Sequence, residues 1–201
     1  MLDGAVRRLI EPGLDRLGAA LARRGVSADQ ITVLGFAIGV AAAGAIATKL
    51  YLLGLVLILA SRLCDGLDGA VARAREKTDR GGFLDIVLDF AFYGIIPLAF
   101  VLAEPGANAV AGAVLLASFY LNGASFLAYA LMAEKRKLQT EARGEKSLYF
   151  TSGLAEATET IGAFCVMCVF PESFAPIAYV FAALTLVTAA ARIALAVKVF
   201  R

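Results

Sequence analysis

The chain has 201 residues, of which 60% are hydrophobic and only 18% are charged. This composition excludes a disordered chain and is too apolar for a water-soluble domain of this length, so it indicates one polytopic membrane domain. The chain contains no His and only three Cys, which excludes His-based triads, His–zinc sites and a disulfide framework. Its net charge of +2 predicts no nucleic-acid partner.

The first 26 residues predict an amphipathic helix. Apolar side chains recur at helical spacing across residues 2–24, with Arg residues between them. This pattern is typical of a helix that lies in the cytoplasmic membrane interface, although an amphipathic helix packed on the bundle is the alternative. Pro12 and Gly13 are expected to break or kink the helix. Ser27, followed by Gln30, predicts the N-cap of the next helix.

Six later segments are long and apolar enough to cross a bilayer core about 30 Å thick. They cover residues 31–47, 50–74, 83–103, 109–133, 154–170 and 174–200. We therefore predict an all-α integral membrane protein with six transmembrane helices plus the N-terminal interfacial helix, in a single domain over residues 1–201. The six-helix bundle would cover residues 27–201. Lys and Arg gather before the first span and in the second and fourth links, which predicts cytoplasmic termini in an inner membrane.

Four aspartates in the second and third spans form the most informative pattern. Two lie three residues apart on one helix, and two lie four residues apart on the next: Asp65, Asp68, Asp85 and Asp89. A short basic link makes the two helices antiparallel neighbours, so the four carboxylates are expected to converge near the cytoplasmic end. One unpaired Asp inside a bilayer costs at least about 2.5–3.5 kcal/mol. Arg62 and Arg73 are too few to neutralise four, so the pattern predicts bound Mg²⁺ or Mn²⁺.

Small residues lie between and beside these acids. Gly66, Gly69, Ala72 and Gly81 would let a nucleotide or phosphate approach the backbone, and Arg73 could face a metal-bound pyrophosphate. Helix packing is the alternative for small residues. We prefer packing for the GxxxG pair Gly35 and Gly39 in the first span.

These residues resemble the signature of one enzyme family. The pattern Asp65-x2-Asp68-Gly69-x2-Ala72-Arg73-x7-Gly81-x3-Asp85-x3-Asp89 is similar to that of the class I CDP-alcohol phosphotransferases, also called CDP-alcohol phosphatidyltransferases, and most similar to a bacterial inner-membrane branch. The first span opens with Asp29-Gln-Ile-Thr32, which is similar to another family pattern.

The resemblance implies an activity and a set of roles. Asp65, Asp68, Asp85 and Asp89 would hold a two-metal site of Mg²⁺ or Mn²⁺, and Asp89 would also be the catalytic base. The CDP pocket would be formed by Asp29, Thr32, Gly66, Gly69, Ala72, Arg73 and Gly81. The enzyme would transfer a phosphatidyl group from CDP-diacylglycerol to a small polar alcohol and release CMP, in phospholipid biosynthesis. The active site would face the cytoplasm, and a homodimer is expected.

The residues leave the acceptor open. Lys135, Arg136 and Lys146 flank the fourth and fifth spans, and Arg192 lies inside the sixth. The resemblance implies that such residues bind an acceptor phosphate, as in glycerol phosphate or inositol phosphate, although Lys135 and Arg136 also fit the ordinary basic flank of a span.

Glu156 and Glu159 favour the opposite kind of acceptor. Their charge would suit a cationic acceptor of the serine type, or they could pair with Arg192 or Lys146 as structural contacts. Two further hypotheses compete with the enzyme as a whole: a divalent-cation transporter that uses the intramembrane carboxylates, and a non-catalytic lipid- or nucleotide-binding protein.

Overall fold

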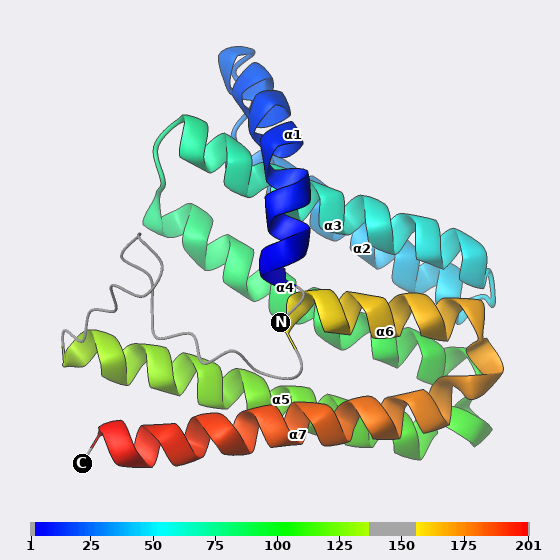
Figure 1. Ribbon diagram of the computed structural model, residues 1–201. Coiled ribbons are helices and arrows are strands. Elements are labelled where there is room, and N and C mark those ends of the chain that lie inside the picture. Colours follow the sequence, from blue (N-terminus) through cyan, green and yellow to red (C-terminus); the bar gives the residue numbers. More distant parts are fainter. Residues whose placement is uncertain (1–2, 137–155, 201) are drawn as a thin grey trace.

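The computed structural model describes residues 3–136 and 156–200, and within them the regular structure is entirely helical. The helices are α1 (Asp3–Arg23), α2 (Ala28–Ala47), α3 (Tyr51–Ala74), α4 (Asp79–Ala103), α5 (Pro105–Lys135), α6 (Ala157–Val169) and α7 (Phe174–Val199), with a short 3₁₀ helix, η1 (Pro171–Ser173), before α7. Helices α2 to α7 run alongside one another, and α1 crosses α3 at a steep angle (Figure 1).

The connections lie where the predicted orientation requires them. The α2–α3, α4–α5 and α6–α7 connections share one end of the bundle, on the right of Figure 1. The α3–α4 link and the last residues of α5 and α7 lie at the other end, on the left. The basic α3–α4 link and the basic end of α5 therefore lie at one end of the bundle, as the predicted orientation would require.

Four of the described helices are long and apolar enough to cross a membrane: α2, α4, α5 and the segment Pro171–Val199. The predicted all-α membrane fold is confirmed, whereas the count of six spans stays a prediction. Helix α3 has a sufficient length of 24 residues but carries Arg62, Asp65 and Asp68 in its interior. Helix α6 has only 13 residues, Ala157–Val169, whereas the predicted span covered residues 154–170, of which residues 154 and 155 lie outside the described part of the chain.

Local capping explains where two helices begin. Ser27 caps α2, because its side chain accepts from the Gln30 amide while the Gln30 side chain accepts from the Ser27 amide, as predicted. Thr78 caps α4 through a 3.0 Å bond from the Gly81 amide. This cap starts α4 at Asp79, four residues before the first apolar residue of the predicted span.

Helix α1 does not break at Pro12 but runs on to Arg23, so of the predicted break or kink the break is wrong. Its second half is held against α3, which outweighs the single backbone hydrogen bond that Pro removes. The contact is close: a Cβ on Gly18 would lie 2.7 Å from the Ala70 Cβ.

The core is built around α4, whose Phe92, Ile96 and Phe100 are completely buried. The ring of Phe92 packs on Phe164 of α6, and the ring of Phe100 packs on Phe174 at the start of α7. Gly35 and Gly39 provide close helix packing as we expected, since a Cβ there would lie 2.8 Å from Cys64 or 2.7 Å from Phe92.

One ion pair joins the two connections at the end opposite the basic segments. Lys49, in the α2–α3 connection, adopts φ 66° and places its Nζ 2.5 Å from Glu104 Oε1, between α4 and α5. The hydrogen bond to Glu104 and the charge of that carboxylate raise the pKa of Lys49. Both partners are exposed, so the pair contributes little to stability.

Candidate active site

The four aspartates of the signature line one pocket between α2, α3 and α4. The remaining walls of the pocket are formed by Thr32, Gly35, Phe36, Ser61, Arg62 and Leu88. The geometry follows from helix periodicity, because residues three or four positions apart share a face, and α3 and α4 are joined by a short link. The pocket combines four acidic side chains with one basic side chain, Arg62.

Asp68 is the most buried of the four acids, with only 5% of its surface exposed. Among residues 3–136 and 156–200, nothing hydrogen-bonds its Oδ2 atom, which is fully buried. A buried carboxylate oxygen without a partner is costly, and a bound cation would remove that cost. Among the oxygens that line the pocket, Asp68 Oδ2 is therefore the first candidate to contact a cation.

Arg62 is the positively charged side chain among the residues that line the pocket. Its Nη1 donates to Asp89 Oδ1 at 2.5 Å and to Asp65 Oδ1 at 3.3 Å, and its Nη2 lies 3.4 Å from Ser61 Oγ. The guanidinium carbon is 3.7 Å from the centre of the Phe92 ring. Sequence reasoning did not assign a role to Arg62, although its position three residues before Asp65 placed it on the acidic face of α3.

The described acids could hold divalent metal by their chemistry and location, but not in their present conformation. In the part of the chain that the structure describes, no three Asp, Glu or Cys side chains are grouped closely enough to bind a metal ion. Arg62 instead contacts two of the acids. The oxygen-only donor set and the unpartnered Asp68 Oδ2 nevertheless fit Mg²⁺ or Mn²⁺.

Three of the residues predicted to bind CDP lie beside the acids. Thr32 is buried and lines the pocket, and its hydroxyl donates to the Ala28 carbonyl at 3.0 Å. Asp29 lies close to Gly81: a Cβ on Gly81 would be 3.1 Å from Asp29 Oδ1. Arg80 also reaches Asp29, at 3.4 Å. Thr32 therefore lines the acidic pocket, and Asp29 and Gly81 precede the pocket residues Thr32 and Asp85 by about one helical turn.

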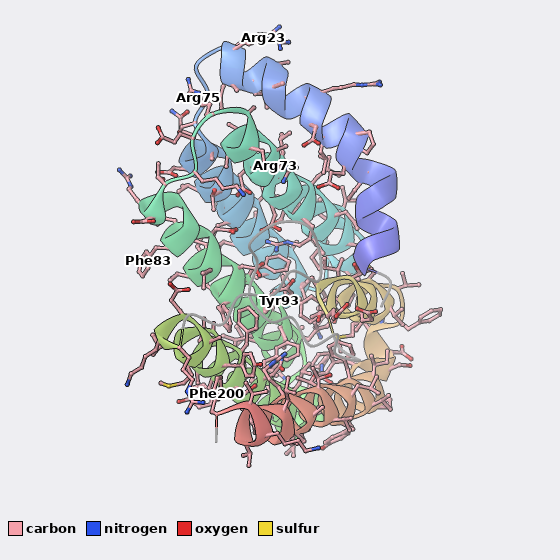
Figure 2. The ribbon with its side chains drawn as sticks, turned by 60° about the vertical axis from the view of Figure 1, so that its left-hand side comes forward. Arg23, Arg73, Arg75, Phe83, Tyr93 and Phe200 are labelled. Carbon is pink, nitrogen blue, oxygen red and sulfur yellow. The ribbon has the colours of Figure 1, made fainter. Side chains whose placement is uncertain are left out.

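Two of the other predicted CDP residues, Gly66 and Arg73, face α1. A Cβ on Gly66 would lie 2.9 Å from Leu14 of α1, and Arg73 Nη2 pairs with Asp15 Oδ1 of α1 at 2.7 Å. Figure 2 shows Arg73 on the side of α3 that α1 covers. The reason is periodicity, since residues 66, 70 and 73 share a face that differs from the face of Asp65 and Asp68. By the same periodicity Gly69 lies between these two faces, whereas Ala72 lies on the face of Asp65 and Asp68.

The predicted acceptor residues are not gathered into one site. Lys135 is exposed at the end of α5. Arg136 donates to the Val199 and Phe200 carbonyls, at 3.2 Å and 2.6 Å, and so binds the C-terminal end of α7. Lys146 lies outside the described residues. Of these basic residues, Arg136 thus has a structural role, because it binds the end of α7.

Glu156 and Glu159 begin α6 rather than pairing with Arg192. Glu156 is the N-cap, and its amide donates to Glu159 Oε2 at 3.2 Å. Both carboxylates also suit the positive end of the helix dipole. Arg192 of α7 contacts α5 instead: its Nη1 donates to Asn122 Oδ1 and Ser125 Oγ, both at 2.8 Å. Sequence reasoning missed Asn122 and Ser125 because a single polar residue in an apolar span carries no partner information.

Comparison with known proteins gives a consistent family assignment. The CDP-alcohol phosphatidyltransferase family profile matches residues 26–199. The inner membrane protein YnjF of Escherichia coli strain K12 is 47% identical over 193 residues, which are 96% of this chain and 94% of that protein. An archaetidylinositol phosphate synthase of Methanothermobacter thermautotrophicus is 42% identical over 92 residues, which are 45% of this chain and 44% of that protein.

Solved structures share the fold. The phosphatidylinositol phosphate synthase PgsA1 of Mycobacterium tuberculosis, solved with CDP-DAG bound, superposes with a TM-score of 0.70 at 20% identity, over 90% of this chain and 91% of that one. A second structure of PgsA1, in complex with manganese and citrate, also gives 0.70, at 21% identity over 90% and 87% of the two chains.

Proposed function

Because the chain belongs to the CDP-alcohol phosphatidyltransferase family, and is thus a transferase of phosphate-containing groups, we propose that it transfers a phosphatidyl group from CDP-diacylglycerol to a phosphorylated polyol. The observation that carries this proposal is the pocket that all four signature aspartates line, in which the buried Oδ2 of Asp68 has no hydrogen-bond partner among the described residues. A pocket so rich in carboxylates suits a metal-bound pyrophosphate.

The donor and the metal are supported by the comparisons. PgsA1, which shares this fold, has been solved with CDP-DAG and with manganese. In our proposal Asp65, Asp68, Asp85 and Asp89 would hold two divalent cations. When bound, these cations would neutralise the pyrophosphate and stabilise CMP as it leaves. Asp29, Thr32, Gly69, Ala72 and Gly81 would then surround the cytidine phosphate.

The residues of the chain would supply positioning and proton transfer. Asp89 would accept the proton of the acceptor hydroxyl, whose oxygen forms a bond to the phosphorus that carries diacylglycerol. The bond from that phosphorus to the bridging oxygen breaks, and CMP leaves with the electron pair. Arg73 now binds Asp15, so it could contact the pyrophosphate only by leaving α1.

The acceptor we favour is inositol phosphate. One relative, 42% identical over the 92 residues that it shares with this chain, is named an archaetidylinositol phosphate synthase, and PgsA1 is named a phosphatidylinositol phosphate synthase. Lys135, Arg136, Lys146 and Arg192 are the candidates for the acceptor phosphate. Arg136 contacts α7 and Arg192 contacts α5. To bind the acceptor phosphate, each would either keep these partners and use its remaining N–H groups, or give the partners up.

Location and assembly complete the proposal. YnjF is named an inner membrane protein, and the same membrane suits this chain. Both termini and the acidic pocket would face the cytoplasm, where a polar acceptor is available while the lipid donor enters from the bilayer. One domain would carry these functions, α1 would lie in the interface, and the active form would be a homodimer.

A panel of acceptors tests the proposed reaction. We would measure CMP release by the purified chain from CDP-diacylglycerol and Mn²⁺, with inositol phosphate, glycerol phosphate, inositol, serine or no acceptor. The proposal predicts CMP release that depends on inositol phosphate. Release with serine alone would instead support the cationic acceptor suggested by Glu156 and Glu159. The absence of release with every acceptor, together with no binding of the donor, would contradict the proposed reaction.

A further inference from the structure

Arg62 occupies a position that the proposed reaction does not explain. Its side chain is only 11% exposed, and it lies in the same pocket as the four acids. It contacts the carboxylates of Asp65 and Asp89, one on α3 and one on α4. One guanidinium therefore joins the two halves of the acidic signature.

The surroundings of Arg62 hold it in place. The guanidinium stacks on Phe92, which is completely buried, and approaches Ser61, whose hydroxyl donates to the Gly35 carbonyl at 2.7 Å. Among the described residues, the buried Nε of Arg62 has no hydrogen-bond partner. Burying a cation that has an unpartnered donor costs desolvation free energy. The ion pairs with Asp65 and Asp89 offset that cost.

The acids depend on Arg62 in the same way. Four carboxylates in one pocket repel each other when no cation is present. Arg62 lies among them and reduces that repulsion, whereas the other Arg of α3, Arg73, pairs with Asp15 of α1. In the arrangement described here, Arg62 is the basic side chain among the residues that line the pocket.

We propose that Arg62 is a positioning residue that acts as the resident counter-cation of the acidic pocket: it holds Asp65 and Asp89 in the metal-free protein and competes with divalent metal for them. This inference rests on the proposed function, because it assumes that these acids bind metal. Binding would require Asp89 to exchange or share its contact with Arg62, and the fixed positive charge would repel the incoming cation.

Thermodynamic linkage gives this inference a measurable sign. A cation that stabilises the metal-free state more than the metal-bound state must weaken metal binding by the same free energy. Removal of the charge should therefore destabilise the metal-free protein and tighten its binding of metal. A residue that only supports the fold would lower stability equally with and without metal.

The test compares Arg62→Gln with wild type in the purified full chain. Titration calorimetry would give the Kd for Mn²⁺, and thermal unfolding would be followed in EDTA and in saturating Mn²⁺. We expect the Kd to fall by about tenfold or more, because a nearby like charge opposes the ion in a medium of low dielectric constant. The Tm should fall in EDTA and be largely restored by Mn²⁺.

Two further variants serve as controls. Arg62→Lys keeps the charge, so its Kd should stay within about threefold of wild type, a change of at most about 0.7 kcal/mol. Lys49→Gln removes the same charge from the ion pair with Glu104, at the other end of the bundle, and should leave the Kd unchanged. A similar tightening in Lys49→Gln would contradict a local role for Arg62.

Other outcomes separate the inference from the proposed function. If Arg62→Gln binds Mn²⁺ no more tightly than wild type, the inference is wrong while the metal site stands. If wild type itself binds no Mn²⁺, the metal dependence of the proposed function fails. If Arg62→Gln folds only in Mn²⁺, the inference is supported, whereas failure to fold even in saturating Mn²⁺ would overturn it.

Discussion

At the scale of single residues, spacing identified the acids but not their partners. The positions of Asp65, Asp68, Asp85 and Asp89 follow from helix periodicity, and the structure brings them to one pocket. Which cation they contact depends on side-chain conformation and on neighbouring helices. For that reason the sequence suggested neither the bridge that Arg62 makes between Asp65 and Asp89 nor the pair of Arg73 with α1.

Replacing Asp89 with Asn tests the base at this scale. Asn cannot accept the hydroxyl proton, and it also weakens one metal ligand, so the rate of CMP release should fall by at least about 100-fold. CDP-diacylglycerol should still bind, because Thr32, Gly69 and Gly81 are unchanged. The rate and the affinity for the donor would be measured on the same preparation. A rate similar to wild type would remove Asp89 as the base.

At the scale of elements, apolar periodicity found every helix but placed several ends a few residues away. The predicted third and fourth spans began at residues 83 and 109, whereas α4 and α5 begin at Asp79 and Pro105. Both differences arise because a cap or an N-terminal Pro starts a helix in polar sequence before the apolar run. Packing of the N-terminal helix on the bundle was the alternative that the sequence left open, but α3 as its partner was not predictable, since that depends on the small-residue contact of Gly18 with Ala70.

Two glycines of α1 provide a matched test of that docking. A Cβ on Gly18 would lie 2.7 Å from the Ala70 Cβ and 2.9 Å from the Ala70 backbone, whereas a Cβ on Gly13 would meet nothing within 4 Å. Gly18→Ala should therefore destabilise the protein by about 1–3 kcal/mol through overpacking. Gly13→Ala should be neutral or stabilise it by up to about 1 kcal/mol, because Ala favours the helix.

Thermal unfolding in detergent would measure both variants, and trypsin cleavage within α1 would report whether the helix has separated from α3. Equal effects of Gly13→Ala and Gly18→Ala on the unfolding temperature would show that the contact of Gly18 with Ala70 does not hold α1 in place.

At the scale of the whole molecule, composition and charge distribution were enough for the fold class, but not for the number of spans. The acids that indicate a functional role for α3 also make it too polar to be identified as a membrane-spanning helix from its composition. The pocket lies in one region of the bundle, which favours an enzyme over an ion pathway that needs polar groups throughout the membrane.

Labelling of single cysteines tests the predicted orientation. In a variant without Cys64, Cys165 and Cys168, Lys77→Cys would report on the α3–α4 link and Gly106→Cys on the start of α5. Both positions are exposed, and they lie at opposite ends of the bundle (Figure 1). In intact bacterial cells whose outer membrane is permeable, an impermeant maleimide should label Gly106→Cys but not Lys77→Cys. The reverse pattern would place the acidic pocket on the periplasmic side.

The central claim is that the four-aspartate pocket carries out metal-dependent phosphatidyl transfer. The most direct measurement is CMP release from CDP-diacylglycerol with inositol phosphate, by wild type and by Asp68→Asn, in EDTA and in Mn²⁺. We predict release by wild type only with Mn²⁺, and a rate at least about 100-fold lower for Asp68→Asn, which replaces one carboxylate oxygen with an amide NH₂ and removes the negative charge that would bind the metal. Metal-independent release, or an undiminished rate in Asp68→Asn, would contradict the account.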